Sequence, residues 1–189
     1  MRLFVAVNLP PAIRERIYVD TAPLRAAATA VRWVGAPSLH VTLKFLGHHD
    51  DALVGEFGRA LAMAAATHPP LEVRTTEVGA FPNFRRPRVV WVGMTGADAL
   101  SALALDVDLA FAGFGVPRET RPFRAHLTLG RVKDEMTPAQ STALATAAGA
   151  VRPARAFSIR TVDLMRSEPG PGGSRYTVLT AAPLHARGT

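Results

Sequence analysis

The sequence predicts an α+β fold with mainly antiparallel sheets. Predicted helices and strands alternate along the chain, but several strands are joined by short turns and carry one polar face, which favours antiparallel over parallel pairing. The chain has 189 residues, 48% of them hydrophobic and 20% charged, which is enough for one compact domain or for two small lobes that share a core. We therefore expect a single domain over residues 1–189.

The first third of the chain is predicted to form three strands and two helices. β-branched and aromatic residues favour a buried strand over residues 2–8, and Pro10-Pro11 starts a helix that continues to about residue 30. A short strand covers residues 32–34, and residues 40–47 alternate polar and apolar side chains as a half-buried strand does. Asp50 and Asp51 begin a helix that continues to about residue 66, because their charge favours a helix N-terminus.

The remaining chain is predicted to add strands and helices in alternation. Two strands cover residues 71–80 and 88–95, and alanine and leucine favour a helix over residues 97–112. Residues 124–131 repeat the alternating strand pattern, and Thr137-Pro138 starts a helix to about residue 148. The last two predicted strands cover residues 154–166 and 175–181, joined by a glycine-rich loop over residues 168–174.

Composition limits the classes of function. The formal net charge is +7, which favours an anionic partner such as nucleic acid, a nucleotide or a membrane surface. No cysteine is present, so disulfides and thiolate metal sites are excluded, and we expect a cytoplasmic protein. No stretch approaches the ~20 apolar residues that cross a bilayer, and we expect no membrane partner.

One motif occurs twice in predicted strands. His40-Val41-Thr42-Leu43 is repeated as His126-Leu127-Thr128-Leu129, 86 positions later. Successive strand side chains point to opposite faces, so each His and Thr project together while the residue between them faces the core. If an approximate two-fold axis relates the two halves, both pairs meet in one cleft.

Two opposed histidines suit the hydrolysis of a phosphodiester. The reaction removes a proton from the attacking water and delivers one to the leaving oxygen, and an imidazole pKa of ~6.5 permits either role near neutral pH. Thr42 and Thr128 can donate hydrogen bonds to the non-bridging phosphate oxygens. The pattern therefore predicts a phosphodiesterase that needs no metal and no cofactor.

The chain resembles the two-histidine phosphoesterase superfamily, specifically the bacterial and archaeal RNA 2′,3′-cyclic phosphodiesterases, also called 2′-5′ RNA ligases. The resemblance covers nearly the whole chain. It is carried by both His-x-Thr motifs and by the segments 2–6, 32–34, 40–47, 81–82, 87–91, 121–131 and 167–179.

The resemblance implies a bilobal fold in which two antiparallel sheets face a central cleft, with helices on the outside. It also implies hydrolysis of a terminal RNA 2′,3′-cyclic phosphate to a 2′-phosphate, with His40 as proton donor and His126 as proton acceptor. The residues alone leave these two roles interchangeable. We expect the partners to be RNA ends or nucleotides that carry a 2′,3′-cyclic phosphate, and the protein to act as a monomer.

Several basic residues are possible additions to the site. Arg131 resembles the family's phosphate-contacting arginine, although strict alternation from His126 puts it on the opposite face unless a bulge near Gly130 turns it back. Lys44 is expected to share the face of His40 and Thr42, as a solvated lysine. Arg85, Arg86 and Arg88 are candidates for contacts with upstream phosphates.

Two other functions remain open from the sequence. One is RNA joining through a 2′-5′ linkage, the reverse of the same chemistry. The other is a non-catalytic protein that binds RNA ends or nucleotides with the same histidines and threonines. Turnover of a cyclic-phosphate oligonucleotide separates the enzymes from the binding protein.

Overall fold

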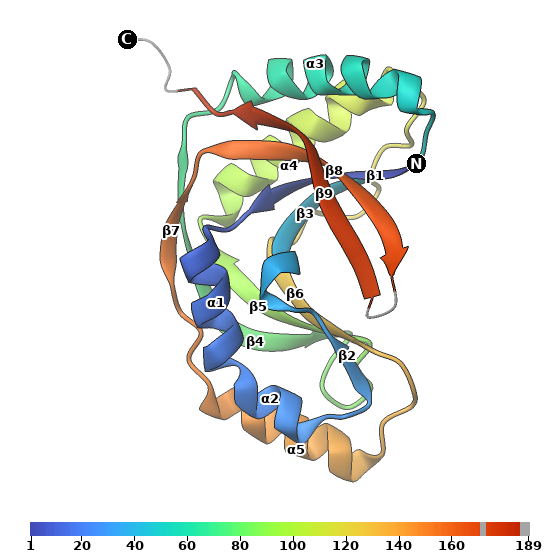
Figure 1. Cartoon of the computed structure of the whole chain (residues 1–189). Helices are drawn as coiled ribbons and strands as arrows, with labels where there is room; N and C mark the ends of the chain where they lie inside the picture. Colours follow the sequence, from blue (N-terminus) through green and yellow to red (C-terminus); the bar gives the residue numbers. More distant parts are fainter. Residues whose placement is uncertain (171–172, 186–189) are drawn as a thin grey trace.

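The computed structural model describes residues 1–170 and 173–185. Within these residues it contains two sheets with helices on their outer sides (Figure 1). The upper sheet has the order β3-β1-β8-β9, with strands His40–His48 (β3), Arg2–Asn8 (β1), Thr161–Gly170 (β8) and Gly173–Pro183 (β9). The lower sheet has the order β2-β6-β5-β4-β7, with strands Val31–Trp33 (β2), His126–Val132 (β6), Val89–Thr95 (β5), Leu71–Phe81 (β4) and Ala156–Ile159 (β7).

Every described pair of neighbouring strands is antiparallel, so the predicted fold class is confirmed. The helices are Pro11–Asp20 (α1), Ala22–Ala27 (α2), Val54–Ala65 (α3), Ala97–Ala112 (α4) and Pro138–Ala150 (α5), with short 3-10 turns at Ala36–Ser38 (η1) and Asp51–Leu53 (η2). Helices α3 and α4 pack on the upper part of the molecule, and α2 and α5 pack together below the lower sheet (Figure 1).

The predicted helix over residues 11–30 is two helices. It breaks at Thr21, whose hydroxyl donates a hydrogen bond to the carbonyl oxygen of Ile17 at 2.8 Å. Pro23 follows in the first turn of α2, where it has no N–H to continue the ladder of α1. Pro23 therefore starts a second helix, and the prediction of one continuous helix is wrong.

The predicted strand over residues 154–166 is also divided. Its first part is β7 at the edge of the lower sheet, and its second part is β8 in the upper sheet, with Arg160 between them. Both parts have the same β-forming composition, so the sequence does not reveal the change of sheet. The loop predicted over residues 168–174 is shorter as well, because β8 continues to Gly170 and β9 begins at Gly173; residues 171–172 lie outside the described part.

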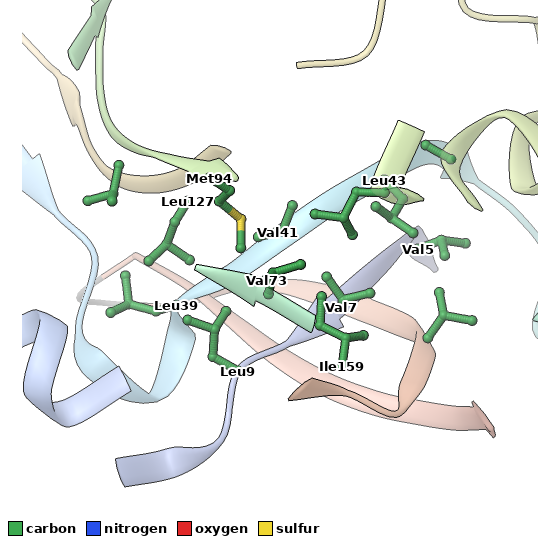
Figure 2. Close-up of a cluster of buried hydrophobic side chains, with 14 of the residues drawn as sticks. Val5, Val7, Leu9, Leu39, Val41, Leu43, Val73, Met94, Leu127 and Ile159 are labelled. Atoms are coloured by element: carbon green, nitrogen blue, oxygen red, sulfur yellow. The ribbon is translucent and has the colours of Figure 1, made fainter. Parts of the chain in front are cut away.

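One buried apolar cluster joins the two sheets. Figure 2 shows side chains from both of them in contact, among them Val41 of β3 and Leu127 of β6. Neither of these side chains is exposed to solvent, and burying each stabilises the fold by about 1.5–3 kcal/mol. The apolar residue inside each His-x-Thr motif therefore belongs to a core that both sheets share.

A β-bulge in β3 overturns the prediction for Lys44. Ala6 of β1 pairs with Thr42 and Val5 pairs with Lys44, so Leu43 has no partner across the ladder. The extra residue resets the alternation of side chains. Lys44 consequently points away from the face of His40 and Thr42, and it is only 2% exposed rather than solvated.

The Lys44 ammonium is bound inside the protein by a carboxylate. Its Nζ lies 2.7 Å from Oδ1 of Asp108 in α4 and donates to the carbonyl oxygen of Pro117 at 2.7 Å. Asp108 also pairs with Arg118. Burial raises the pKa of Asp108, but the hydrogen bonds from Lys44 and Arg118 outweigh it and hold that pKa below its usual value. Lys44 thus connects β3 to α4 and, through Pro117, to the segment between α4 and β6.

We predict that Lys44→Ala lowers the free energy of unfolding by about 3 kcal/mol, because the carboxylate of Asp108 stays buried without its buried cation. Urea unfolding measures the loss. The matched control is Lys133→Ala, which removes an exposed lysine and should change stability by less than about 0.5 kcal/mol. Equal stability of the two variants would contradict the assigned role of Lys44.

Candidate active site

The first motif presents His40 in a defined tautomer. Its Nδ1 lies 2.8 Å from the carbonyl oxygen of Ser38, two residues earlier. A carbonyl oxygen only accepts hydrogen bonds, so Nδ1 carries the hydrogen, and Nε2 of the neutral ring keeps a free lone pair. The 3-10 turn η1 immediately before β3 places this carbonyl beside the ring.

The second motif repeats the same arrangement. Nδ1 of His126 lies 2.6 Å from the carbonyl oxygen of Arg124, again two residues earlier. Both rings therefore leave Nε2 available to accept or donate a proton. Thr42 and Thr128 are half-buried and lie two residues after each histidine on the same face of their strands.

The two motifs come together at the junction of the two sheets. Strands β3 and β6 are in contact near the centre of the molecule (Figure 1). Val41 and Leu127 enter the same core. The histidine and threonine that flank each of them therefore lie on the opposite face of their strand. Each histidine and threonine thus lies on the face of its strand opposite to the shared core, and the two strands are in contact.

Arg131 lies on the same face as these side chains because β6 contains a bulge. Trp91 of β5 pairs with Thr128 and Val90 pairs with Gly130, so Leu129 has no partner. Leu129 and Gly130 are both buried, and Arg131 is exposed on the other face. Strict alternation would have turned this arginine away from His126, and the bulge reverses that direction.

Gly130 is required at the bulge by close packing against β2. A Cβ atom on Gly130 would lie 2.6 Å from Cγ1 of Val31 and 3.0 Å from a ring carbon of Trp33. The corresponding residue after the bulge in β3 is Lys44, which has space to reach Asp108. Both motifs therefore bulge at their leucine, although the residues that follow differ.

The residues that follow the bulges make the two halves of the site unlike each other. Arg131 occupies one position, and Phe45, which is 53% exposed, occupies the equivalent one in β3. The ring of Phe45 is 6.3 Å from that of Phe4, measured between centroids. One half therefore carries a cation where the other carries an aromatic ring.

The surroundings lower the pKa of both histidines. Burial lowers the pKa of His40, the carbonyl of Ser38 partly offsets this, and the charges of Arg14 and Arg131 lower it further. Burial also lowers the pKa of His126, the carbonyl of Arg124 opposes it, and the charge of Arg131 adds to the decrease. Arg131 thus acts on both rings, which places it close to both motifs.

Three residues for which the sequence predicted no role at the site also surround the histidines. The ring of Tyr176 in β9 lies edge-on to His40 with 4.9 Å between centroids, and that of Phe81 in β4 lies edge-on to His126 at 5.2 Å. Arg14 of α1 adds charge beside His40 and donates to the carbonyl oxygen of Pro37 at 2.6 Å. Phe81 and Tyr176 lie in segments that carry the family resemblance, but no local pattern indicates that any of the three residues contacts a histidine.

The side chain of Phe4 in β1 is 2% exposed and packs against His40 and Tyr176, with centroid distances of 5.1 and 5.3 Å.

Within residues 1–170 and 173–185, no group of three or more His, Asp or Glu side chains is arranged to hold a metal ion. In the same residues, no helix has both the length and the apolar character that a membrane span requires.

Comparisons with known proteins point to one family. The 2′-5′ RNA ligase superfamily matches residues 9–171. An RNA 2′,3′-cyclic phosphodiesterase of Methanothermobacter thermautotrophicus is 32% identical over 94% of this chain and 95% of its own length. Among solved structures, TT0787 of Thermus thermophilus covers both chains completely with a TM-score of 0.80 and 26% identity. Escherichia coli LigT in complex with 3′-AMP covers 97% of both chains, with a TM-score of 0.71 and 30% identity.

We predict that Arg131→Ala raises the pKa of both His40 and His126, because it removes a positive charge that both rings experience. Arg14→Ala should raise the pKa of His40 alone. Titration of the histidine ring signals by two-dimensional NMR measures these shifts. A change at only one ring in Arg131→Ala would show that the motifs do not converge on this arginine.

Proposed function

The chain belongs to the 2′-5′ RNA ligase superfamily, and we propose that it hydrolyses a terminal RNA 2′,3′-cyclic phosphate to a 2′-phosphate without a metal. The observation that carries the proposal is the pair of His-x-Thr motifs, in which Nδ1 of each histidine is bound to a backbone carbonyl and Nε2 is free. The name of the relative from M. thermautotrophicus supports the substrate.

In the proposed reaction His126 acts as general base. Its neutral Nε2 accepts a proton from a water molecule, whose oxygen attacks phosphorus opposite the 3′ oxygen. The hydrogen bond from Nδ1 to the carbonyl of Arg124 stabilises the imidazolium that forms. The general base thus needs no carboxylate, because a backbone carbonyl orients its ring.

His40 acts as general acid in the same step. As the bond between phosphorus and the 3′ oxygen breaks, Nε2 of protonated His40 gives its proton to that oxygen, which becomes the 3′ hydroxyl. The product keeps its phosphate on the 2′ oxygen. His126 then releases its proton to solvent and His40 gains one, which restores the starting state.

The remaining candidate residues bind the phosphate itself. The hydroxyls of Thr42 and Thr128 donate hydrogen bonds to the two non-bridging oxygens, and Arg131 offsets the negative charge that grows in the transition state. All five residues come from one chain, which supports our proposal that a monomer is the active unit. A chain without cysteine is suited to the cytoplasm, where we propose it acts.

We predict that His40→Ala and His126→Ala each lower kcat by about 10²–10⁴-fold, because each removes one proton transfer. Activity of the unchanged protein should persist in EDTA. The matched control is His68→Ala, since His68 binds Asp106 at 2.8 Å outside the site. Full activity in either site variant, or loss of activity in EDTA, would refute the mechanism. Product analysis must give a 2′-phosphate.

The same variants separate the roles of the two histidines when sulfur replaces the 3′ oxygen of the substrate. A thiolate leaves without a proton because a thiol pKa of ~8.5 is far below that of an alcohol. The sulfur substrate should restore most of the rate of His40→Ala and none of that of His126→Ala. Rescue of His126→Ala alone would exchange the two roles.

We predict a bell-shaped pH profile with its optimum on the acidic side of neutrality. The value of kcat/KM rises as the base His126 loses its proton and falls as the acid His40 loses its own. The surroundings lower both pKa values in the free protein, so both limbs of the profile shift to lower pH. Bound phosphate raises both pKa values, so kcat should peak at higher pH than kcat/KM. An optimum of kcat/KM above about pH 7 would contradict these shifts, given the ordinary histidine pKa of ~6.5.

A further inference from the structure

A pocket rich in arginine lies beside the second motif, and we call it the basic groove. Its volume is about 540 Å³, and Phe81, Val89, Arg88, Arg121 and Arg124 line it together with two prolines. No acidic side chain is among the lining residues. The groove therefore combines an apolar floor with three guanidinium groups.

The groove is continuous with the candidate active site. The ring of Phe81 in its floor meets the ring of His126 edge-on, with 5.2 Å between centroids. Arg124 supplies the carbonyl oxygen that accepts the hydrogen bond from His126, and Val89 pairs with Arg131 across the β5–β6 ladder. The groove therefore borders the second motif.

The charges of the groove are not neutralised by the protein. Arg88, Arg121 and Arg124 are exposed, and in the described part of the chain none of them forms an ion pair with a carboxylate. Neighbouring cations repel one another, so a bound anion would be stabilised there. The planar guanidinium group matches phosphate with paired hydrogen bonds.

Hydrogen bonds fix the backbone of two of these arginines, Arg88 and Arg124. The N–H of Arg88 donates to the carbonyl oxygen of Phe81 at 2.7 Å, and the carbonyl oxygen of Arg88 accepts from the N–H of Val132 at 3.0 Å. Arg124 lies two residues before β6 and is tied to His126. Binding of an anion by Arg88 and Arg124 therefore requires ordering of their side chains only, which lowers its entropic cost.

The other side of the site has a different character. Phe45 and Val178, 53% and 48% exposed, belong to strands of the upper sheet that holds His40. The guanidinium groups of the groove are all on the side of His126. On the side of His40, Arg14 is bound to the carbonyl oxygen of Pro37, and Arg166 and Arg175 both pair with Glu168. The guanidinium groups of the groove form no ion pair in the described part of the chain, so they favour one direction of a bound polyanion.

We propose that the basic groove binds the phosphodiester that joins the terminal nucleotide of a single-stranded RNA to the nucleotide before it. The base of that preceding nucleotide lies on the apolar floor formed by Phe81 and Val89, as bases do on aromatic side chains. This inference rests on the proposed function, since it takes the cyclic phosphate to lie between the two histidines. It makes an RNA end the preferred substrate over a cyclic mononucleotide.

The test compares a ribodinucleotide and a mononucleotide that both end in a 2′,3′-cyclic phosphate. We expect the unchanged protein to have the higher kcat/KM for the dinucleotide, and Arg88→Gln/Arg121→Gln to lower the ratio of the two kcat/KM values at least tenfold. Loss of one phosphate contact should also reduce the slope of log(kcat/KM) against log[salt] for the dinucleotide by about 0.7.

The matched control also removes two arginine charges, but from positions on α3 and β4 that lie outside the groove lining. Arg59→Gln/Arg74→Gln should leave the ratio unchanged, because these exposed arginines do not line the groove. An unchanged ratio in Arg88→Gln/Arg121→Gln would overturn the proposal. An equal decrease in the control would overturn it too, because the effect would then come from net charge.

A binding measurement separates this proposal from the proposed function. If the unchanged protein hydrolyses neither substrate, the proposed function fails, and calorimetry with a dinucleotide that carries a terminal 2′-phosphate tests the groove alone. We expect Arg88→Gln/Arg121→Gln to weaken this binding at least tenfold and the binding of a mononucleoside 2′-phosphate much less. Equal weakening of both ligands would overturn the groove assignment.

Discussion

The candidate site depends on one packing constraint, the burial of Val41 and Leu127 in a common core (Figure 2). These residues come from strands of different sheets, and each lies between the histidine and threonine of its motif. Because strand side chains alternate, burial of the middle residue on one face brings the polar pair out on the other. The energy of the hydrophobic core thereby determines where the polar groups appear.

The two bulges complete the polar face. Each removes Leu43 or Leu129 from the pairing of its strand, so that the fifth residue after each histidine returns to the histidine's face. In β6 this residue is Arg131, whose charge lowers the pKa of both imidazoles. In β3 the bulge also directs Lys44 inward to Asp108, which connects the first motif to the segment before the second. The bulge in β3 therefore affects both the side chains of the candidate site and the buried ion pair between Lys44 and Asp108.

The approximate symmetry of the motifs is broken by what surrounds them. His40 packs against Phe4 and Tyr176 and is near Arg14, whereas His126 packs against Phe81 and borders the basic groove. Two chemically equivalent imidazoles thus stand in different surroundings. The proposed reaction assigns distinct donor and acceptor roles to the two histidines, and different surroundings are consistent with such an assignment.

The sequence by itself determined the fold class, most strands, helix α4 and both His-x-Thr motifs, because these depend on local periodicity and composition. It did not determine the break at Thr21, the division of β7 from β8, or the burial of Lys44. Only the tertiary structure decided the direction of Arg131 and the proximity of Arg14, Tyr176 and Phe81 to the histidines. Bulges and contacts between distant segments arise from pairing across the sheets, and pairing partners leave no signal in a single stretch of chain.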